Sequence, residues 1–338
     1  MTANYTEHWE KWWKGSNVRL VNFMAKDNIP FHTVVFPSTL IGANDGYICL
    51  NDISSTGFMV RLFIEYLNYD NQKFSKSRGI GIFGNDAMNT TIKSDVYRLY
   101  LLANRPETHD TSFSWDDLQI RNDGEFIASI GNFVNRALSL LHTKFNGEIR
   151  KIELSDDECS VVTQIDKSLD DYINAMKSYK FREAYAHICH IAHHGNRYFQ
   201  QMEPWVVKGR EEKVITALIF SANIVALLSL ILEPFAPEIC GQIRQDIKLE
   251  PEKCVIPPGF VKLLTDGTII NKPPIYFPKI KPEYIKSLKI SSVKRTKLLQ
   301  NEFYKENPVK IIFKFPHLTD YFNRSYLHCL TFEQYDFW

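Results

Sequence analysis

Basic and hydroxyl side chains crowd into one short loop, KFSKSRGIGIFG, at residues 73–84. Lys73 and Lys76 lie three residues apart, so two ammonium groups can hold several phosphate oxygens. The hydroxyls of Ser75 and Ser77, together with the glycine amides, add hydrogen-bond donors. A lysine acts as a point charge that can follow negative charge onto a leaving pyrophosphate. This chemistry favours a polyphosphate site. The alternative is a solvated basic turn, which composition alone would favour.

The glycines of this loop have the spacing G-x-G-x-x-G, which also occurs in dinucleotide-binding folds. That interpretation requires a strand directly before the first glycine, a helix opening on the third, and an acidic residue about 20 positions later. Here a charged SKSR loop precedes Gly79, and helical character resumes only near Ser94. The context disfavours a dinucleotide, so the triphosphate of a nucleotide is the better interpretation of the anion.

A second group of side chains with binding chemistry is predicted on a helix in the middle of the chain. Asn132 and Arg136 are four residues apart and nearly opposite the apolar face of that helix, so they point away from the core. Trp205 follows a later helix in the sequence MEPW. Proteins bind the bases of single-stranded RNA loops with amide and guanidinium donors beside an aromatic platform. A solvated helix face and a tryptophan packed at a helix end are the ordinary alternatives.

Histidines form a third cluster, His187, His190 and His194, within a narrow sector of one helix. Two histidines at i and i+4 can chelate zinc. No glutamate stands inside the pair as the H-E-x-x-H pattern requires, and Cys189 points elsewhere. The six cysteines of the chain are scattered and never form C-x-x-C, which argues against a disulfide framework or a zinc ribbon and suits a reducing cytosol. We therefore predict no metal site in this chain.

The bulk composition allows one large or two ordinary domains, because 44% of the 338 residues are hydrophobic. The net charge is +1, so a nucleic-acid partner would have to be held by local patches. Residues 214–232 are uncharged throughout, and their length is close to the ~20 residues that span a bilayer. The central helix of a bundle is also apolar on all sides, and we interpret this segment as a buried helix.

The elements that must position these groups change in character along the chain. Residues 1–104 mix turns with short apolar runs that indicate strands, such as HTVVFP at 32–37 and EYLNYD at 65–70. A helix is predicted after them, capped by Ser94 and stopped by Pro106. This mixture is typical of an α/β domain.

Residues 105–250 have helical periodicity and predict a bundle of four helices with short connections. Residues 251–338 are rich in proline and lysine and are predicted to be an extension rather than a domain, without clear periodicity after about residue 297. The fourth helix is the apolar run 214–232, and the other three each have one apolar face: Phe126, Ile130, Phe133, Ala137 and Leu141; Val162, Ile165, Leu169, Ile173 and Met176; Phe181, Ala184, Tyr185, Ile188 and Ala192.

KFSKS followed by RG resembles the KMSKS loop of class I aminoacyl-tRNA synthetases, in the form found in eukaryotic cytosolic methionyl-tRNA synthetases. Other segments between residue 3 and about residue 290 occur in that family's order and spacing: ANYTEHWEKWW, FMAKDNIPFH, EYLNYD, KFSKSRGIGIFGNDA, RPETHDTSFSWDDL, GNFVNRA, HGNRYFQQMEPW and LEPFAP. The resemblance implies the C-terminal half of a Rossmann-like catalytic domain followed by an α-helical anticodon-binding bundle. The expected fold class is therefore α/β followed by all-α.

The resemblance also implies a reaction, the joining of methionine to tRNA through an aminoacyl-adenylate at the expense of ATP. The loop that closes on ATP is matched by Lys73, Ser75, Lys76 and Ser77, with the two lysines in the catalytic role. Lys76 matches the motif's second lysine, which stabilises the triphosphate as the methionine carboxylate attacks the α-phosphate.

The segment FMAKDNIPFH resembles the strand and turn that line the methionine and adenosine sites of the family. Phe31 and His32 are therefore candidates for the methionine pocket, and Lys26 and Asp27 are weaker ones. Taken alone, a single Phe-His pair is more often core packing.

In the helical part, Asn132, Arg136 and Trp205 match the family's anticodon-reading positions. The resemblance thus implies a cytoplasmic methionine–tRNA ligase that binds tRNA(Met), methionine and ATP with Mg²⁺, touches no membrane, and is a candidate member of a multi-synthetase complex. The alternative from another class is a non-catalytic tRNA-binding module in which only the helical part functions.

The chain departs from the family in three places. The first half of the catalytic domain, with its HIGH-type motif, and the inserted zinc-bearing domain are expected to precede residue 1. GFMVRLFI at 57–64 is expected to be an insertion, and the resemblance ends after about Lys297. On these grounds we expect a partial or mis-spliced gene product.

Overall fold

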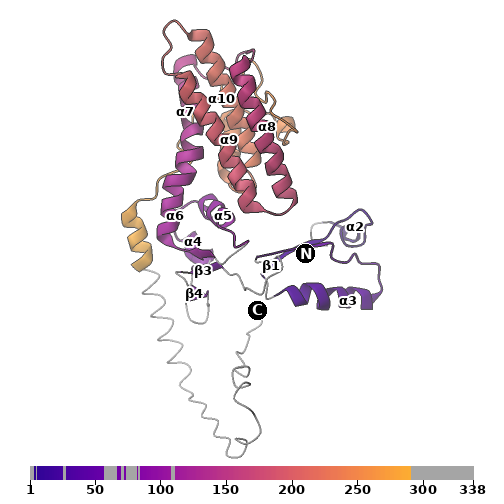
Figure 1. Ribbon diagram of the computed structural model, residues 1–338. Coiled ribbons are helices and arrows are strands. Elements are labelled where there is room, and N and C mark those ends of the chain that lie inside the picture. Colours follow the sequence, from indigo (N-terminus) through magenta and orange to yellow (C-terminus); the bar gives the residue numbers. More distant parts are fainter. Residues whose placement is uncertain are drawn as a thin grey trace, which may run out of the picture.

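Two kinds of structure make up the computed structural model, a helical bundle and a smaller part with short strands (Figure 1). The described residues are 4, 6–25, 28–56, 67–69, 72–73, 82, 84–107 and 111–290. The expected insertion at 57–64 and the chain after residue 297 lie outside them. The expected order, α/β followed by all-α, is confirmed.

Two parallel strands form the first sheet, β1 (Val21–Ala25) and β2 (Asp52–Thr56), paired from Val21 opposite Asp52 to Ala25 opposite Thr56. The short helix α2 (Trp9–Trp13) precedes them, and the π-helix η2 (Phe31–Val35) runs into helix α3 (Phe36–Ala43) between them. Parallel strands cannot be joined by a tight hairpin and need a crossover of this kind. The unit is therefore a piece of α/β structure.

The predicted strand at 32–37 is wrong, because these residues are helical in η2 and α3. The β-branched run lowers helix propensity by only some tenths of a kcal/mol per residue. Because η2 continues directly into α3, Pro37 lies within a continuous helical segment and removes one backbone donor from it. Asn44 then ends the helix in the left-handed conformation, at φ 48°. The crossover between parallel strands outweighs the local preference.

A second sheet has three short strands in the order β4 (Gln72–Lys73), β3 (Leu67–Tyr69) and β5 (Thr111–Phe113). Strand β3 runs antiparallel to β4 and parallel to β5. The strand predicted in EYLNYD is therefore confirmed over 67–69. Helices α4 (Gly84–Met88) and α5 (Ser94–Ala103) lie between β4 and β5 in the sequence.

The predicted cap of α5 is wrong. Lys93 occupies the N-cap position without a side-chain hydrogen bond, and Ser94 is the first helical residue. The Ser94 hydroxyl donates to Glu238 Oε1 at 3.2 Å, and the buried Asp95 carboxylate accepts from the backbone N–H of Ile239 at 2.7 Å. Both side chains therefore bind helix α11 (Pro237–Asp246) rather than their own helix.

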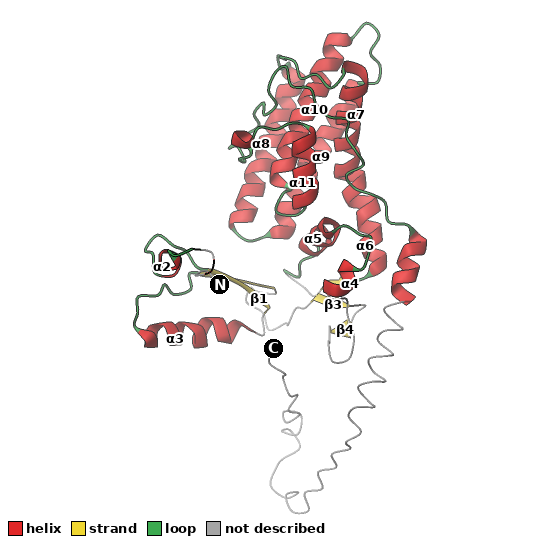
Figure 2. Cartoon of the chain, turned by 180° about the vertical axis from the view of Figure 1, so that it is seen from behind, coloured by secondary structure: helices red, strands yellow, loops and turns green. Residues whose placement is uncertain are grey.

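The bundle begins with a continuous rod formed by α6 (Trp115–Arg121), the π-helix η3 (Asn122–Gly131) and α7 (Asn132–Phe145). Helices α9 (Phe181–Met202) and α10 (Glu211–Ile231) pack beside it, and α8 (Asp156–Lys177) packs against α9 (Figure 2). The 3-10 turn η4 (Pro251–Lys253) follows α11. The predicted faces point inward: Phe126, Ile130, Phe133, Ala137, Leu141, Ile165, Leu169, Ala184, Tyr185, Ile188 and Ala192 are buried, and Val162, Ile173, Met176 and Phe181 are half-buried against the same core.

Helix α10 runs through the centre of the bundle. Its length and composition would suffice to cross a membrane, but 94% of its most apolar window is buried inside the protein. Asn223 has polar partners there, because its Nδ2 donates to the carbonyl of Ile219 at 2.9 Å and its Oδ1 accepts from Leu263 N and Leu264 N at 2.8 and 3.0 Å. The prediction of a buried helix at this apolar run is therefore confirmed.

The segment after η4 lies along the bundle and returns toward the first part of the chain. The hydroxyl of Tyr276 donates to Asp246 Oδ2 at 2.9 Å, which fixes the segment to the end of α11. Residues 282–290 are helical, and there the Tyr284 hydroxyl accepts from the backbone N–H of Thr91 at 2.8 Å. This extension therefore ties the bundle to the turn between α4 and α5.

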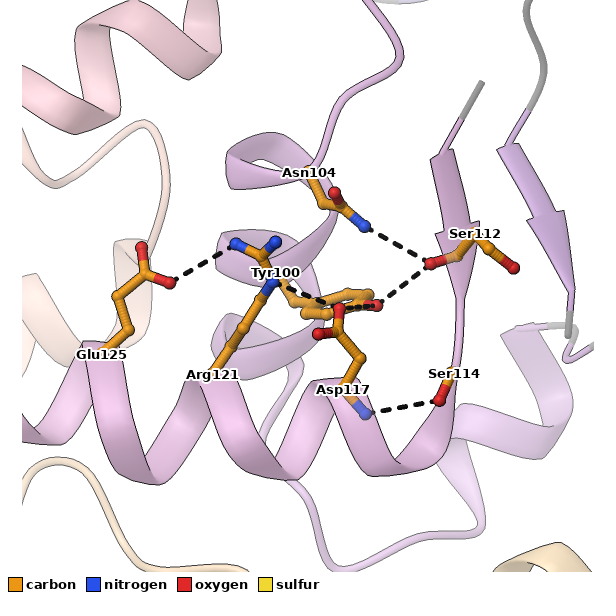
Figure 3. A network of polar contacts seen from close by, with 7 residues as sticks. All are labelled: Tyr100, Asn104, Ser112, Ser114, Asp117, Arg121 and Glu125. Carbon is orange, nitrogen blue, oxygen red and sulfur yellow. Dashed lines mark hydrogen bonds and ion pairs between the residues drawn. The ribbon is translucent and has the colours of Figure 1, made fainter. Parts of the chain in front are cut away.

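A polar network joins α5, β5 and α6 (Figure 3). The Tyr100 hydroxyl lies 2.7 Å from Asp117 Oδ2 and 3.3 Å from the carbonyl of Ser112, and its single proton goes to the nearer carboxylate. Arg121 Nε donates to the same carboxylate oxygen at 3.1 Å, and Ser114 Oγ caps α6 by accepting from Asp117 N at 3.3 Å. Burial raises the pKa of Tyr100 well above its usual range, so the phenol stays neutral and donates.

Candidate nucleic-acid interface

Arg136 lies against two aromatic rings at one end of the bundle. Its guanidinium carbon is 4.9 Å from the ring centroid of Phe199 and 5.8 Å from that of Trp205. Its Nη2 donates to Gln200 Oε1 at 3.5 Å. Asn132 is exposed one turn earlier on α7. The structure therefore brings two of the three predicted base-contacting residues together and places the third on the neighbouring turn.

Close packing between α7 and α9 sets this geometry. A Cβ atom on Gly195 would lie 2.5 Å from Phe133 Cζ, so only glycine lets the Phe133 ring reach α9. The Phe133 ring then meets Phe199 edge-on, at 6.4 Å between centroids and 89° between planes. Asn196 Nδ2 donates to the carbonyl of Ser129 at 2.8 Å, which fixes α9 against η3.

A turn at the end of α9 presents Trp205. Glu203 ends the helix in the left-handed conformation, at φ 46°, which costs energy for a residue with a Cβ atom. The backbone N–H of Val206 donates to the Glu203 carbonyl at 2.9 Å and closes the turn. The indole is 43% exposed, and its ring lies 6.4 Å from that of Phe199 with a tilt of 48°. Solvent can thus reach one part of the ring while another part packs.

Charges near this end of the bundle are balanced. The segment 203–213 (EPWVVKGREEK) carries three basic and three acidic residues. Arg210 Nη2 donates to the carbonyl of Met202 at 3.1 Å and thereby stabilises the end of α9. Because this segment carries no net charge, it would contribute to ligand binding through stacking and directed hydrogen bonds more than through general attraction.

The π-helix η3 immediately precedes the exposed face of α7. Helices of this type are rare and are frequent at functional sites. They also change which side chains share a face, because each turn contains more residues than an α-helical turn. Gly131 ends η3 close to Phe277, where an added Cβ would lie 3.2 Å from the phenylalanine ring. Asn132 and Arg136 therefore begin a new register on α7.

The residues predicted for methionine lie far along the chain from this interface, on η2. Phe31 is 57% exposed, and His32 Nδ1 lies 2.9 Å from Asn22 Nδ2 on β1. The backbone of Lys73 pairs with Asn68 in the second sheet. The other loop residues, Ser75, Lys76 and Ser77, lie outside the described residues, as do Lys26 and Asp27. The roles of these residues stay predictions.

The histidine cluster lies on α9, with the rings of His187 and His190 5.6 Å apart. In the part of the chain that the structure describes, no group of three or more histidine, cysteine, aspartate or glutamate side chains is placed to hold a metal ion. Burial lowers the pKa of His194, and the neighbouring Arg197 adds to this shift, so the imidazole is neutral at physiological pH.

Two partners of Arg136, Phe199 and Gln200, were not predicted from the sequence. They directly follow Tyr198 on α9, whereas Arg136 is on α7 more than sixty positions earlier. No local periodicity links the two helices. The only sequence signal was the position of both residues inside the segment HGNRYFQQMEPW.

Two family models match the chain in succession. Residues 1–138 match the tRNA synthetases of class I (M), and residues 151–291 match the anticodon-binding domain of methionyl tRNA ligase. The cytoplasmic methionine–tRNA ligase of Xenopus laevis is 41% identical over 294 residues, and that of Homo sapiens is 38% identical over 295. Each alignment covers 86% of this chain and 32% of the relative.

Solved structures agree on the fold. The Mycobacterium tuberculosis methionyl-tRNA synthetase superposes with a TM-score of 0.65 in its apo form and 0.68 in complex with methionyl-adenylate. The sequence identities are 22% and 23%, and the matches cover 82% and 81% of this chain and 52% of that protein. At this identity the likeness shows a shared fold.

Proposed function

This chain belongs to the methionyl-tRNA synthetases of class I, and we propose that it recognises the anticodon of tRNA(Met) as part of a methionine–tRNA ligase. The chain spans 32% of the length of the Xenopus and human relatives. The observation that carries the proposal is the placement of Arg136 beside the exposed ring of Trp205, with Asn132 one turn away.

Recognition at this site follows from the chemistry of the three side chains. A base splayed out of the anticodon loop stacks on the Trp205 ring. The planar fork of Arg136 and the amide of Asn132 hydrogen-bond to base edges, where the pattern of donors and acceptors differs between bases. Stacking supplies affinity that any base can use, whereas the directed hydrogen bonds supply preference for the CAU sequence.

The proposed reaction activates methionine before transfer to the tRNA. The methionine carboxylate attacks the α-phosphate of ATP, and negative charge develops on the leaving pyrophosphate. Lys73 and Lys76 stabilise that charge, assisted by Ser75 and Ser77, and Mg²⁺ accompanies the ATP. Phe31 and His32 contribute to the methionine pocket. The family's cytoplasmic relatives support a cytoplasmic protein, and co-purification with other synthetases tests membership in a multi-synthetase complex.

Anticodon binding is tested by replacing Trp205 with alanine. Base–aromatic stacking is worth roughly 1–3 kcal/mol per base, so Trp205→Ala should weaken binding of tRNA(Met) by about tenfold or more. Trp12→Ala is the matched control, because Trp12 is an exposed tryptophan on α2. A tRNA with the same body and an altered anticodon serves as the second ligand. If Trp205→Ala binds tRNA(Met) as tightly as the wild-type protein does, the indole is a packing residue only.

The non-catalytic alternative is tested by methionine-dependent exchange of pyrophosphate into ATP. If the chain, or the longer protein that contains it, catalyses exchange, Lys76→Ala should lower the rate far more than it weakens methionine binding, since the lysine acts on the transition state. Anticodon-specific binding without exchange would instead identify a tRNA-binding module.

A further inference from the structure

Two residues contact the guanidinium of Arg136 in the protein without bound RNA. Phe199 lies beneath it, with its ring centroid 4.9 Å from the guanidinium carbon, and Gln200 accepts from its Nη2 at 3.5 Å. The Phe199 side chain is 2% exposed and is itself fixed edge-on by Phe133. The ring under Arg136 is therefore buried and packed on its far side, whereas the contact with Gln200 is at the solvent-facing edge.

An arginine that recognises a base by hydrogen bonds benefits when its side chain is already ordered before the base binds. The side chain has several rotatable bonds, and fixing them on binding costs conformational entropy that is subtracted from affinity. A mobile guanidinium still attracts phosphate groups of any sequence. A guanidinium whose plane and edge are fixed offers its donors in one direction and can distinguish one base edge from another. Pre-ordering should therefore affect selectivity more than overall attraction.

We propose that Phe199 and Gln200 are positioning residues for anticodon recognition: Phe199 fixes the plane of the Arg136 guanidinium and Gln200 fixes its edge. This inference rests on the proposed function, since it concerns how the same site selects tRNA(Met). The ordinary alternative for Phe199 is core packing without influence on the ligand, and for Gln200 it is a solvated amide on a helix surface.

Three variants separate these alternatives. Phe199→Leu keeps a large apolar side chain in the core and removes the aromatic face. Gln200→Ala removes the acceptor at the guanidinium edge. Gln201→Ala is the matched control, because Gln201 is the next residue on α9, is also exposed, and points about 100° away around the helix. Melting temperatures identify any variant in which folding itself is affected.

The first measurement is the ratio of dissociation constants for tRNA(Met) and for the same tRNA with an altered anticodon. A partly exposed cation–π contact corresponds to about a two- to fivefold change in an equilibrium constant, and we expect that loss of discrimination in Phe199→Leu. Gln200→Ala should lower the ratio by a smaller factor, and Gln201→Ala should leave it unchanged. Binding of the altered tRNA should change little in all three.

The second measurement needs no RNA. Nitrogen-15 relaxation of the Arg136 Nε–Hε group reports side-chain mobility, which should be low in the wild-type protein and higher in Phe199→Leu and Gln200→Ala. If the wild-type protein fails to discriminate the two tRNAs, the proposed function is wrong, while relaxation still decides whether Arg136 is held. The positioning role itself is overturned if Arg136 is equally mobile in all proteins, or if both variants discriminate as well as the wild type.

Discussion

The helical bundle and the β1–β2 unit bury their side chains very differently. In the bundle, residues from every long helix have no measurable exposure, among them Leu138, Leu169, Ile188 and Ile224. Among described residues 4, 6–25 and 28–55, only Ser54 and Ser55 are buried. Large apolar side chains of that unit, such as Trp12 and Ile41, are more than half exposed. The bundle thus contains a core of its own, whereas the described residues of the β1–β2 unit do not form one.

The β1–β2 unit instead packs against the turn that joins α8 to α9. The Phe23 ring of β1 lies 5.4 Å from Tyr179 and 6.0 Å from Phe181. Arg105 links three parts of the chain, because its Nη2 donates to Ser54 Oγ at 2.9 Å and its Nη1 to the Tyr179 carbonyl at 3.0 Å. The burial of apolar side chains in the bundle is therefore the main source of folding stability, and a few contacts with the bundle hold the two strands in place.

The largest expected effect comes from the bundle core. Ile224→Ala removes a fully buried side chain on α10 and should lower the free energy of unfolding by about 2–5 kcal/mol, whereas Ile41→Ala, on the exposed α3, should change it by less than about 0.5 kcal/mol. Urea denaturation followed by circular dichroism at the helical band measures both. Similar losses in the two variants would refute the contrast between the regions.

The next effect concerns the link between the regions. The Arg105 side chain is 12% exposed and also donates to Glu107 at 3.2 Å, so Arg105→Ala leaves partly buried partners unpaired and should cost about 1.5–3 kcal/mol. Hydrogen exchange should speed up in β1 and β2 and stay slow in α10. Lys180→Ala, which breaks the exposed pair with Glu183, is the control and should leave both regions unchanged. Faster exchange in α10 alone would contradict the proposed link.

A third effect tests the packing that positions Arg136. Gly195→Ala places a Cβ atom against Phe133 and should cost about 1–3 kcal/mol through overpacking. Gly241→Ala is the control: it lies within α11, where no atom is within 4 Å of the added Cβ, so the better helix propensity should stabilise by up to about 1 kcal/mol. Thermal unfolding distinguishes the opposite signs. A stabilised Gly195→Ala protein would show that α7 and α9 can move apart without loss.

The smallest expected effect is a pH dependence of folding stability that arises where α5 contacts α11. Burial raises the pKa of Asp95, with a contribution from the neighbouring Glu238. A carboxyl group of this kind makes its full contribution to folding stability below the pKa that it has in the unfolded chain, about 3.9. This contribution is lost as the pH rises through the higher pKa of the folded state. Asp95→Asn keeps an acceptor for Ile239 N–H and cannot ionise, so its stability relative to wild type should increase from pH 4 to 7.

Asp95→Ala is the companion variant, since it removes the acceptor altogether. It should cost about 0.5–2 kcal/mol, as the loss of a helix-capping side chain does. Melting temperatures between pH 4 and 8 compare the three proteins. A wild-type protein that gains stability over Asp95→Asn as pH rises would show that the carboxylate is stabilised in its charged form.

Much of the helical part could be predicted because its signals are local. The apolar positions from Phe126 to Leu141 recur at helical spacing, and a helix that buries one face must repeat its apolar residues in that way. The uncharged run of α10 carried the same information about a helix buried all round. The motifs around KFSKS and MEPW identified the family, since order and spacing are properties of the chain itself.

The failures occurred where a side chain has a partner far away in the sequence. Serine is a common N-cap residue, but in the structure the Ser94 hydroxyl donates to the carboxylate of Glu238 instead. The run at 32–37 has strand-forming residues, yet the crossover between β1 and β2 requires a helix there. In both cases a local preference, worth up to about 2 kcal/mol for an N-cap and some tenths of a kcal/mol per residue for strand-forming residues, was outweighed by tertiary contacts.

The sequence by itself determined the family, the four amphipathic or apolar helices, and the types of side chain at the candidate anticodon site. Only the tertiary structure decided that Arg136 rests on Phe199 and contacts Gln200. That arrangement depends on the distance between α7 and α9, which Gly195 allows to be short enough for Phe133 to fit. Helical periodicity states which face of a helix is buried, but the partner across that face is chosen by packing among elements distant in sequence.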